Sequence, residues 1–423
     1  MHNDTLSDRF RRHTLQPEEA QRLVLEQANP LSIEHVPLFE AWGRRLAEPL
    51  AAPHPFPPFR RSGMDGYAVR AADLRDATPE RPVTLIVVEE LPCGVEPARM
   101  IGEGQAARIM TGGMVPDGAD AVVMLEATTT TADTREDGEH GFVHIAKPIA
   151  SGLNVADIGC EMRSGELLLP AGSIVQAGES ALLAACGQAV VAVVRRPRVA
   201  ILATGNELLG VDQPLEPAKI RNSNVPMLAA MIREAGAEPL VLGTATDDRA
   251  ETEAIIRRTL PQCDLLLTTG GVSVGDYDVM VDVLAQADVR LLFNKVAMRP
   301  GSPTSAATIH NKLIIALSGN PGACFVGFHL FALPVIKRML RVQDPYAASF
   351  QARLGVPFPK VNAYRRYIRG RTQLEAGTVN VFPTGDDKSS LMTTIVGADC
   401  LIEIPPLKAG LEAGQLVTAW RLS

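Results

Sequence analysis

A glycine-rich turn between an apolar run and a helical pattern is the first stretch whose residues could do chemistry. From Asp264 to Asp278 the sequence reads DLLLTTGGVSVGDYD, and its apolar run predicts a short strand buried on both faces. The next residues, DVMVDVLAQA, have helical apolar spacing. A strand, a tight turn and a helix start favour phosphate, because N–H groups at a helix N-terminus attract anions. The small residues of this turn are Gly270, Gly271, Ser273 and Gly275.

Carboxylates accompany this turn and the ends of two other predicted strands. Asp276 and Asp278 follow the glycines directly, and negative groups beside a phosphate require a cation such as Mg²⁺ between them. Glu207 follows VAILAT, and Asp247 follows EPLVLGTA. The neighbouring Asp248 fits a helix N-cap, with Glu251 three residues later as in a capping box. No comparable structural role explains Asp247. Because Walker and dinucleotide fingerprints are absent, the carboxylates favour a metal-assisted phosphate ligand over a hydride cofactor.

A second glycine turn and two cations could also hold an oxyanion. The segment ALSGNPGA follows a later predicted strand and opens a helix, so it is another candidate anion cradle. Its turn residues are Ser318, Gly319, Asn320 and Pro321. The segment NKVAMRPGSP offers Lys295, a mobile point charge, and Arg299, whose planar fork suits tetrahedral oxyanions. The alternative is that both are solvated surface cations.

Two glycine turns nearer the N-terminus have an open interpretation. In RSGMDGYAV, Gly63 and Gly66 flank Asp65 closely, and strained turns are often functional. In RIMTGGMV, Thr111 lies on a glycine turn. Ordinary turn chemistry explains both stretches equally well.

Composition excludes several classes of protein. With 423 residues, two to four domains are expected. A net charge of −7 argues against a general nucleic-acid binder. No apolar leader and no uninterrupted apolar run long enough for a bilayer are found, which argues against export and a membrane span. The six scattered cysteines suit a reducing cytoplasm and argue against a zinc ribbon or a disulfide scaffold. His140 and His144 could be metal ligands, but a strand is preferred because their segment alternates.

The order of patterns predicts an α/β multidomain chain. A helix is expected from Pro17, ending before Pro30, and the proline-rich AAPHPFPPF marks a boundary. Short strand patterns follow to about Ser151 and form a β-rich module. After a helix closed by Gly187, strands and helices alternate, which predicts a doubly wound, mostly parallel sheet. A final β-rich segment begins near Asp344.

Together these motifs resemble the molybdopterin molybdenumtransferase family, which includes the E domain of gephyrin. The motifs that carry the resemblance, in chain order, are RSGMDGYAV, RIMTGGMVPDGADAVVMLE, ATGNEL, TTGGVSVGDYD, RPGSP and SGNPG. The resemblance implies a sheet domain like that of molybdopterin adenylyltransferases, an inserted β-rich module, an elongated α+β domain and a C-terminal β barrel. The implied boundaries are 1–52 with 152–190 for the elongated dimerisation domain, 53–151 for the inserted module, 191–341 for the molybdopterin-binding α/β domain and 342–423 for the barrel.

The resemblance also implies an activity. A cytoplasmic homodimer would insert molybdate into adenylylated molybdopterin with Mg²⁺ and release AMP, with a molybdopterin adenylyltransferase and molybdoenzymes as partners. Neither nucleic acid nor a membrane is implied. The implied catalytic residues are Asp65, Thr111, Glu207, Asp247, Lys295 and Arg299. Glu207 and Asp278 would hold the metal, and Arg369 and Ser389 would join the two glycine turns in binding substrate.

Several residues depart from the family pattern, and they keep other functions open. Arg299 keeps a charge, whereas Ser302, Ser318, Ala156 and Ile158 stand where the family has lysine, proline or charged residues, and Asn222 replaces an aspartate. A non-catalytic paralogue that binds or delivers molybdopterin is therefore an alternative. Adenylyl transfer on the same sheet is another, and scaffolding of a membrane receptor is a third.

Overall fold

The computed structural model describes residues 14–131, 141–271, 279–286, 288–361 and 363–422. The chain separates into two compact units. The larger comprises the described parts of Met1–Glu48, Gly172–Ala177 and Val190–Ser423, and the smaller comprises those of Pro49–Ala171 and Gly178–Ala189. The division into four domains stays a prediction.

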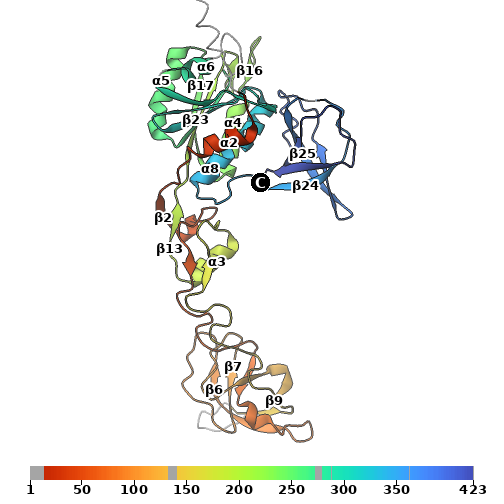
Figure 1. The fold of residues 1–423 in the computed structure, drawn as a ribbon. Coiled ribbons are helices and arrows are strands. Elements are labelled where there is room, and N and C mark those ends of the chain that lie inside the picture. The colour runs from red at the N-terminus through yellow and green to blue at the C-terminus, as the bar shows by residue number, and fades with distance from the viewer. Residues whose placement is uncertain (1–13, 132–140, 272–278, 287, 362, 423) are drawn as a thin grey trace, which may run out of the picture. The chain divides into compact units, whose positions relative to one another are not determined.

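A six-stranded sheet forms the centre of the larger unit (Figure 1). Its order is β17-β14-β18-β23-β22-β19. The four parallel strands are β14 (Arg198–Thr204), β17 (Glu238–Ala245), β18 (Leu265–Thr269) and β23 (Lys312–Leu317). The antiparallel edge consists of β22 (Ser305–Ile309) and β19 (Val289–Phe293). The prediction of a mostly parallel sheet is confirmed.

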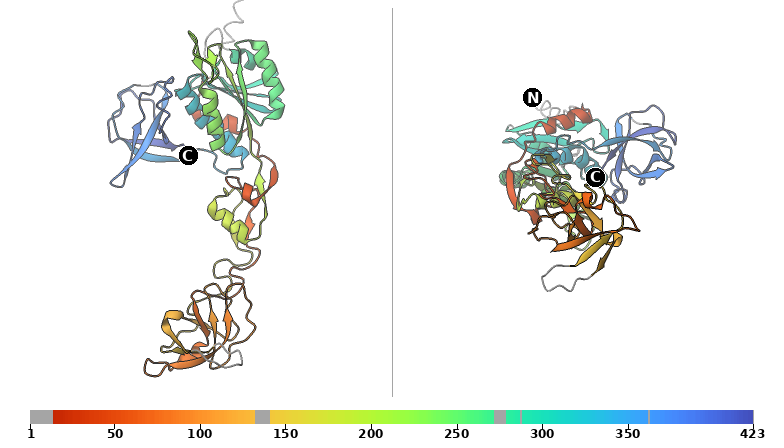
Figure 2. Two further views of the ribbon diagram at one scale, coloured as in Figure 1. Left: turned by 180° about the vertical axis from the view of Figure 1, so that it is seen from behind. Right: turned by 90° about the horizontal axis from the view of Figure 1, so that it is seen from below.

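Helices cover both faces of this sheet, as the view from behind in Figure 2 also shows. Ile201 and Leu267 face a core shared with α4 (Asn224–Glu234). Leu202 and Leu266 face the opposite core, shared with α5 (Arg249–Thr259) and α6 (Val279–Leu284). Alternating residues of one strand are therefore buried on opposite faces, which explains its continuous apolar run.

The long helical segment after β23 consists of α7 (Pro321–Gly327), a π-helical turn η5 (Phe328–Ala332) and α8 (Leu333–Met339). By length and composition this 19-residue segment could cross a membrane, but 83% of the most apolar window is buried inside the protein. Its apolar residues belong to the core that also buries Ala20 and Val24 of α2 (Pro17–Leu25). The helix predicted from Pro17 is confirmed, with Glu18 and Glu19 in its first turn.

The predicted βα order ends at β19. Instead of a helix, short strands β20 (Lys295–Val296) and β21 (Met298–Arg299) follow, and they pair outside the sheet. The chain then returns through the hairpin of β22 and β23, whose two-residue turn has positive φ at His310 and Asn311. Such a turn matches the twist of paired antiparallel strands. Lys295 and Arg299 therefore do not lie on a βα loop.

A closed barrel follows the helical segment. Its strands are β24 (Ser349–Leu354), β25 (Arg365–Glu375), β26 (Thr378–Pro383), β27 (Cys400–Ile404) and β28 (Leu416–Arg421). The pairing of β25 with β27 closes the ring. Ile368, Val381 and Ile402 are among the buried residues of its core.

The smaller unit contains the predicted β-rich module as a second six-stranded sheet, of order β8-β5-β7-β6-β10-β9. Its strands are β5 (Gly66–Val69), β6 (Val83–Leu91), β7 (Gln105–Ile109), β8 (Ala121–Met124), β9 (Thr128–Thr131) and β10 (Phe142–Ile145). His144 lies on β10 and contacts Thr84 and Thr131 on the flanking strands, which confirms the strand interpretation of this segment. His140 lies outside the described residues.

Candidate functional site

A pocket of about 1130 Å³ opens where the parallel strands of the larger unit end. Glu207 follows β14, Asp247 follows β17, and Gly270 with Gly271 follows β18. The turn after β23 contributes Ser318, Gly319, Asn320 and Pro321. The pocket therefore occupies the usual ligand position of an open α/β sheet, outside the carboxyl ends of its strands.

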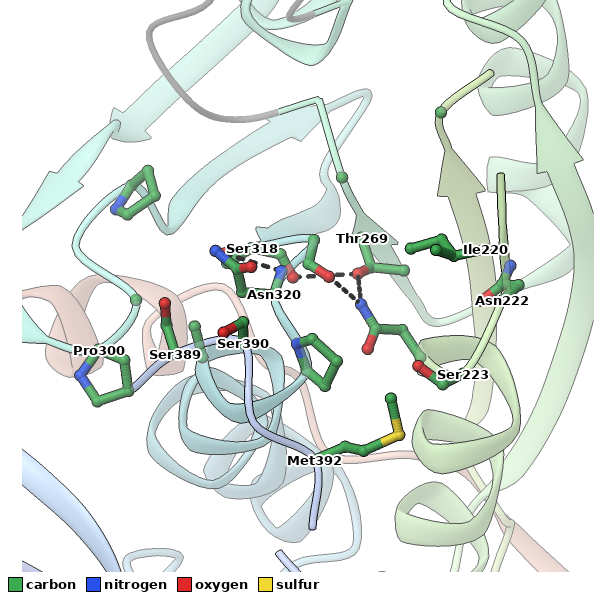
Figure 3. Close-up of a pocket in the computed structure, with 18 of the residues that line it drawn as sticks. Ile220, Asn222, Ser223, Thr269, Pro300, Ser318, Asn320, Ser389, Ser390 and Met392 are labelled. Atoms are coloured by element: carbon green, nitrogen blue, oxygen red, sulfur yellow. Dashed lines mark hydrogen bonds between the residues drawn. The ribbon is translucent and has the colours of Figure 1, made fainter. Parts of the chain in front are cut away.

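Hydrogen bonds fix the floor of this pocket (Figure 3). The Asn224 side-chain Nδ2 donates to Thr269 Oγ1 and to the Gly319 carbonyl, both at 2.8 Å. The Thr269 hydroxyl donates to the Ser318 carbonyl at 3.1 Å. One asparagine thus joins both predicted glycine turns. Asn224 was not predicted as a site residue, although it lies in the same RNSN segment as Asn222.

Glycine at position 270 is required by close packing. Its φ is +97°, and an added Cβ would lie 2.3 Å from the Thr204 carbonyl oxygen. At Gly319, an added Cβ would lie 3.4 Å from the Gly270 Cα, so the two turns pack directly against one another. The backbone of both turns is consequently exposed to a ligand without a side chain in between.

The acidic part of the pocket contains Glu207 and Asp247. Asp247 and Asn206 exchange hydrogen bonds, because the Asn206 N–H donates to Asp247 Oδ2 at 3.2 Å and the Asp247 N–H to Asn206 Oδ1 at 3.3 Å. Asp248 accepts from the Glu251 N–H at 2.8 Å, so the predicted N-cap is confirmed. The Glu251 carboxylate accepts from Thr246 rather than completing the capping box.

The predicted metal and phosphate site includes four residues beyond the described ranges. Ser273, Gly275, Asp276 and Asp278 lie outside the described residues. Within the described ranges, no three His, Cys, Asp or Glu side chains form a metal-binding group. The buried Thr204 hydroxyl has no hydrogen-bond partner among those residues. The Thr204 hydroxyl and the carboxylates of Glu207 and Asp247 line the same pocket and are hard oxygen donors, so their chemistry fits Mg²⁺.

The two predicted cations differ in position. Arg299 lines the pocket, and its guanidinium carbon lies 6.0 Å from the centre of the Tyr364 ring. Lys295 is not among the lining residues; it pairs on β20 with Thr14 of β1 (Thr14–Leu15). Ser302 also lines the pocket, and its hydroxyl donates to the Val296 carbonyl at 2.9 Å. A polar, uncharged group thus occupies the position where the family pattern has lysine.

The loop between β26 and β27 forms another wall of the pocket. Ser389 is the residue of this loop that was predicted to bind substrate. The lining residues contributed by the barrel are Arg366, Asp387, Lys388, Ser389, Ser390 and Met392. The Gly322 N–H at the start of α7 donates to the Ser389 carbonyl at 2.8 Å, which places the loop against the second glycine turn. The polar run GDDKSS was the available sequence signal for this wall.

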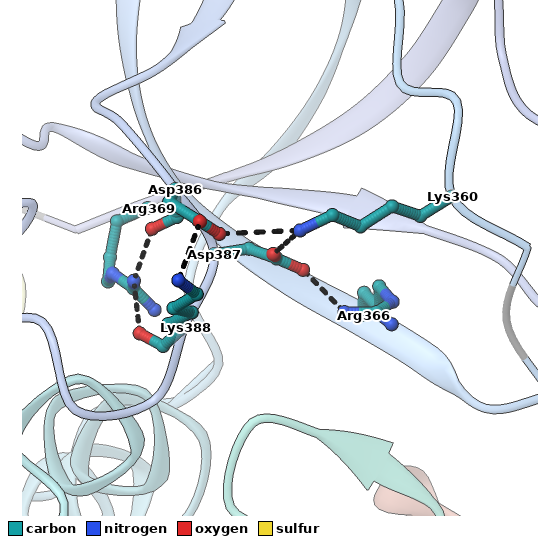
Figure 4. Close-up of polar contacts among 6 residues, drawn as sticks. All are labelled: Lys360, Arg366, Arg369, Asp386, Asp387 and Lys388. Atoms are coloured by element: carbon teal, nitrogen blue, oxygen red, sulfur yellow. Dashed lines mark hydrogen bonds and ion pairs between the residues drawn. The ribbon is translucent and has the colours of Figure 1, made fainter.

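Arg369 lies behind this wall rather than among the lining residues. Only 1% of its surface is exposed, and burial lowers the pKa of its guanidinium. Its Nε donates to the Thr394 hydroxyl at 2.9 Å. Its Nη2 donates to the carbonyls of Asp386 and Lys388 at 3.2 and 3.0 Å (Figure 4). Among the described residues its Nη1 has no partner. Arg369 therefore holds the loop in place.

The smaller unit brings together two other predicted residues. The Asp65 carboxylate accepts hydrogen bonds from the backbone N–H and the hydroxyl of Thr111, at 2.6 and 2.7 Å. These bonds lower the pKa of Asp65, the backbone bond most strongly.

Of the departures from the family pattern, Ala156 lies in β11 (Val155–Ala156) and Ile158 is exposed. Asn222 accepts from the Val225 N–H near the start of α4.

Three family models match consecutive parts of the chain. Residues 15–187 match "MoeA N-terminal region (domain I and II)" and residues 200–338 match "Probable molybdopterin binding domain". Residues 351–422 match "MoeA C-terminal region (domain IV)". The matches cover both compact units.

Similar proteins give the same assignment. The chain is 42% identical over 400 residues to a molybdopterin molybdenumtransferase of Bacillus subtilis, covering 95% of this chain and 92% of the relative. A molybdopterin molybdenumtransferase of Staphylococcus aureus is 37% identical over 95% of this chain and 93% of its own length. The solved molybdopterin biosynthesis MoeA protein of Pyrococcus horikoshii is 31% identical with a TM-score of 0.82, covering 97% of this chain and 100% of that one. The chain therefore belongs to the molybdopterin molybdenumtransferase (MoeA) family, whose members are transferases of molybdenum cofactor biosynthesis.

Proposed function

We propose that this protein inserts molybdenum from molybdate into adenylylated molybdopterin and releases AMP. The pocket at the sheet edge carries the proposal, since its two glycine turns, acidic residues and cationic wall suit a phosphate ester and an oxyanion. The similarity to molybdopterin molybdenumtransferases supports the choice of substrate.

Each part of the pocket has a role in this proposal. The turns at Gly270 and Gly319 bring backbone close to the phosphates of the substrate. Arg299 and the barrel residues Arg366 and Lys388 attract molybdate. The parallel strand order places Glu207 and Asp247 at the β14 and β17 ends, whereas the barrel loop adjoins the turn after β23.

Magnesium is part of the proposal. Glu207 and Asp278 would hold the ion, with Asp247 and the Thr204 hydroxyl near Glu207, and bound Mg²⁺ would polarise the phosphoanhydride. Asp247 exchanges hydrogen bonds with Asn206, the residue before Glu207. Asp247 therefore fixes the backbone next to Glu207 and helps to position the Glu207 carboxylate.

The direct test is an AMP-release assay. Purified protein with adenylylated molybdopterin, Mg²⁺ and molybdate is expected to release AMP, and omission of molybdate should suppress it. The matched control is the Bacillus subtilis relative under identical conditions. Absence of AMP when that relative is active would contradict the proposal. Tight molybdopterin binding without AMP would instead favour the carrier alternative, which the uncharged Ser302 supports.

We also propose that the protein works as a cytoplasmic homodimer. Phe39 and Trp42 are 99% and 74% exposed in the single chain, and large exposed aromatic residues are typical of contact surfaces. Sedimentation should show a dimer, and Phe39→Asp with Trp42→Glu should shift it toward monomer. A molybdopterin adenylyltransferase would supply the substrate, and molybdoenzymes would receive the product.

A further inference from the structure

Five charged side chains of the barrel lie together behind and within the loop wall of the pocket. We call them the barrel charge cluster: Lys360, Arg366, Asp386, Asp387 and Lys388 (Figure 4). Asp387 is at the centre, because its two carboxylate oxygens contact Lys360 Nζ and Arg366 Nη1. Asp386 contacts Lys360 at 3.3 Å and Lys388 at 3.6 Å.

The pair of Arg366 and Asp387 is largely withdrawn from water. Their side chains are 14% and 8% exposed, although both residues line the pocket. The Arg366 Nε has no partner among the described residues, and its guanidinium carbon lies 5.8 Å from the centre of the Phe358 ring. Arg366 lines the pocket and can therefore bind an oxyanion there, but Asp387 already neutralises much of the positive charge of Arg366.

Asp387 is the acidic residue among the barrel residues that line the pocket. Its neighbours in this wall are Arg366, Lys388 and two serines, all suited to an oxyanion. An incoming oxyanion must therefore share Arg366 with Asp387 and lie near a fixed negative charge. Charges in a partly dry pocket are weakly screened, so this repulsion is felt directly.

We propose that Asp387 is an internal counter-anion that weakens oxyanion binding at the barrel wall and so sets the affinity of the pocket for its oxyanion substrate. The role of molybdate as that substrate rests on the function proposed above. Without Asp387, Arg366 would carry an uncompensated, partly buried charge, and an entering oxyanion would take over the neutralising role.

The first test is Asp387→Asn, which keeps the shape of the side chain and removes its charge. Calorimetric titration with molybdate, and separately with sulfate, should show a dissociation constant about fivefold lower than for the unaltered protein. The matched control is Glu375→Gln, since Glu375 is an exposed acidic residue of the same barrel that accepts from Gln373 and does not line the pocket. This control should change the constant by less than about twofold. Unchanged or weaker binding by a folded Asp387→Asn variant would overturn the proposal.

A double-mutant cycle separates this role from a structural one. Arg366→Gln should weaken oxyanion binding, and adding Asp387→Asn to it should tighten binding clearly less than Asp387→Asn does alone, because only the direct repulsion remains to be relieved. If Asp387→Asn tightens binding equally in both backgrounds, the residue does not act through Arg366 and the proposal fails. Thermal unfolding reports whether each variant folds. Should Asp387→Asn not fold, Lys360→Met must weaken binding, because Asp387 then keeps more uncompensated charge; an unchanged constant would refute the proposal.

The same variants distinguish this inference from the proposed function. AMP release by the unaltered protein with an unchanged KM for molybdate in Asp387→Asn would leave the function standing and refute the role of Asp387. Tighter molybdate and sulfate binding in the variant without AMP release by any form would refute the function and leave the role of Asp387 standing.

Discussion

Asp65 and Thr111, which are 46 residues apart, meet through two hydrogen bonds to a single carboxylate oxygen. The sequence presented each as an ambiguous turn residue, and β5 and β7 bring the two turns together by pairing antiparallel. A charged acceptor with two donors stays ionised over a wider pH range than a solvated one.

Thr111→Val should therefore raise the pKa of Asp65 toward its ordinary value of 3.8, because one of the two bonds is lost. The depressed pKa of Asp65 contributes stability above pH 3.8 that is lost as the pH falls through the lower folded value. The variant should lose this contribution at a higher pH during acid titration, monitored by carboxylate NMR signals. Thr129→Val, at an exposed strand position, serves as control. An identical Asp65 titration in both variants would contradict the assignment.

Glu207→Gln should reduce AMP release by about 100-fold and raise the Mg²⁺ concentration needed for activity, since an oxygen donor loses its charge. Asp247→Asn should reduce it about tenfold, because Asp247 acts through Asn206. The neighbouring Asp248→Asn is a matched control, as asparagine caps a helix as well as aspartate does. Steady-state assays across a Mg²⁺ series measure all three. Full activity of the Glu207→Gln variant would show that Glu207 is not a metal ligand.

Gly270→Ala should lower the free energy of unfolding of the larger unit and distort the floor of its pocket. Its Cβ would meet the Thr204 carbonyl at 2.3 Å in addition to the strain of a positive φ. At Gly397, φ is +74° with open space around the Cβ position, so Gly397→Ala should cost only about 1 kcal/mol. Urea denaturation of both variants measures the difference. Equal losses would mean that the floor relaxes around the added methyl group.

Arg369→Met should lower the free energy of unfolding by about 3 kcal/mol, because three hydrogen bonds from a buried charged group are lost. Arg371→Met, two residues along the same strand and exposed, should change it by less than about 0.5 kcal/mol. A loss of molybdate affinity without loss of stability would show instead that Arg369 contacts the substrate directly.

Local sequence patterns were enough to predict most of the elements and the positions of the strand-end turns. Apolar runs such as VAILAT and DLLLTTGG became buried parallel strands because both faces of the sheet carry helices. Glycine is needed at position 270 because an added Cβ would lie 2.3 Å from the Thr204 carbonyl oxygen, whereas at Gly319 it would make an ordinary contact of 3.4 Å with the Gly270 Cα. The edge hairpin of β22 was missed, since SAATI has small residues and a weak strand pattern.

The set of side chains that share the pocket depends on the folded arrangement of distant segments. Arg366, Asp387 and Lys388 lie far from the sheet strands in sequence, and they join the site because the barrel loop docks at the Gly322 end of α7. Arg369 was predicted as a ligand contact, and its burial behind the wall depends on carbonyl groups of a loop that no local pattern reveals. Periodicity and turn chemistry are local properties of the chain, whereas pocket walls arise from contacts between distant segments, so the first can be predicted from sequence and the second cannot.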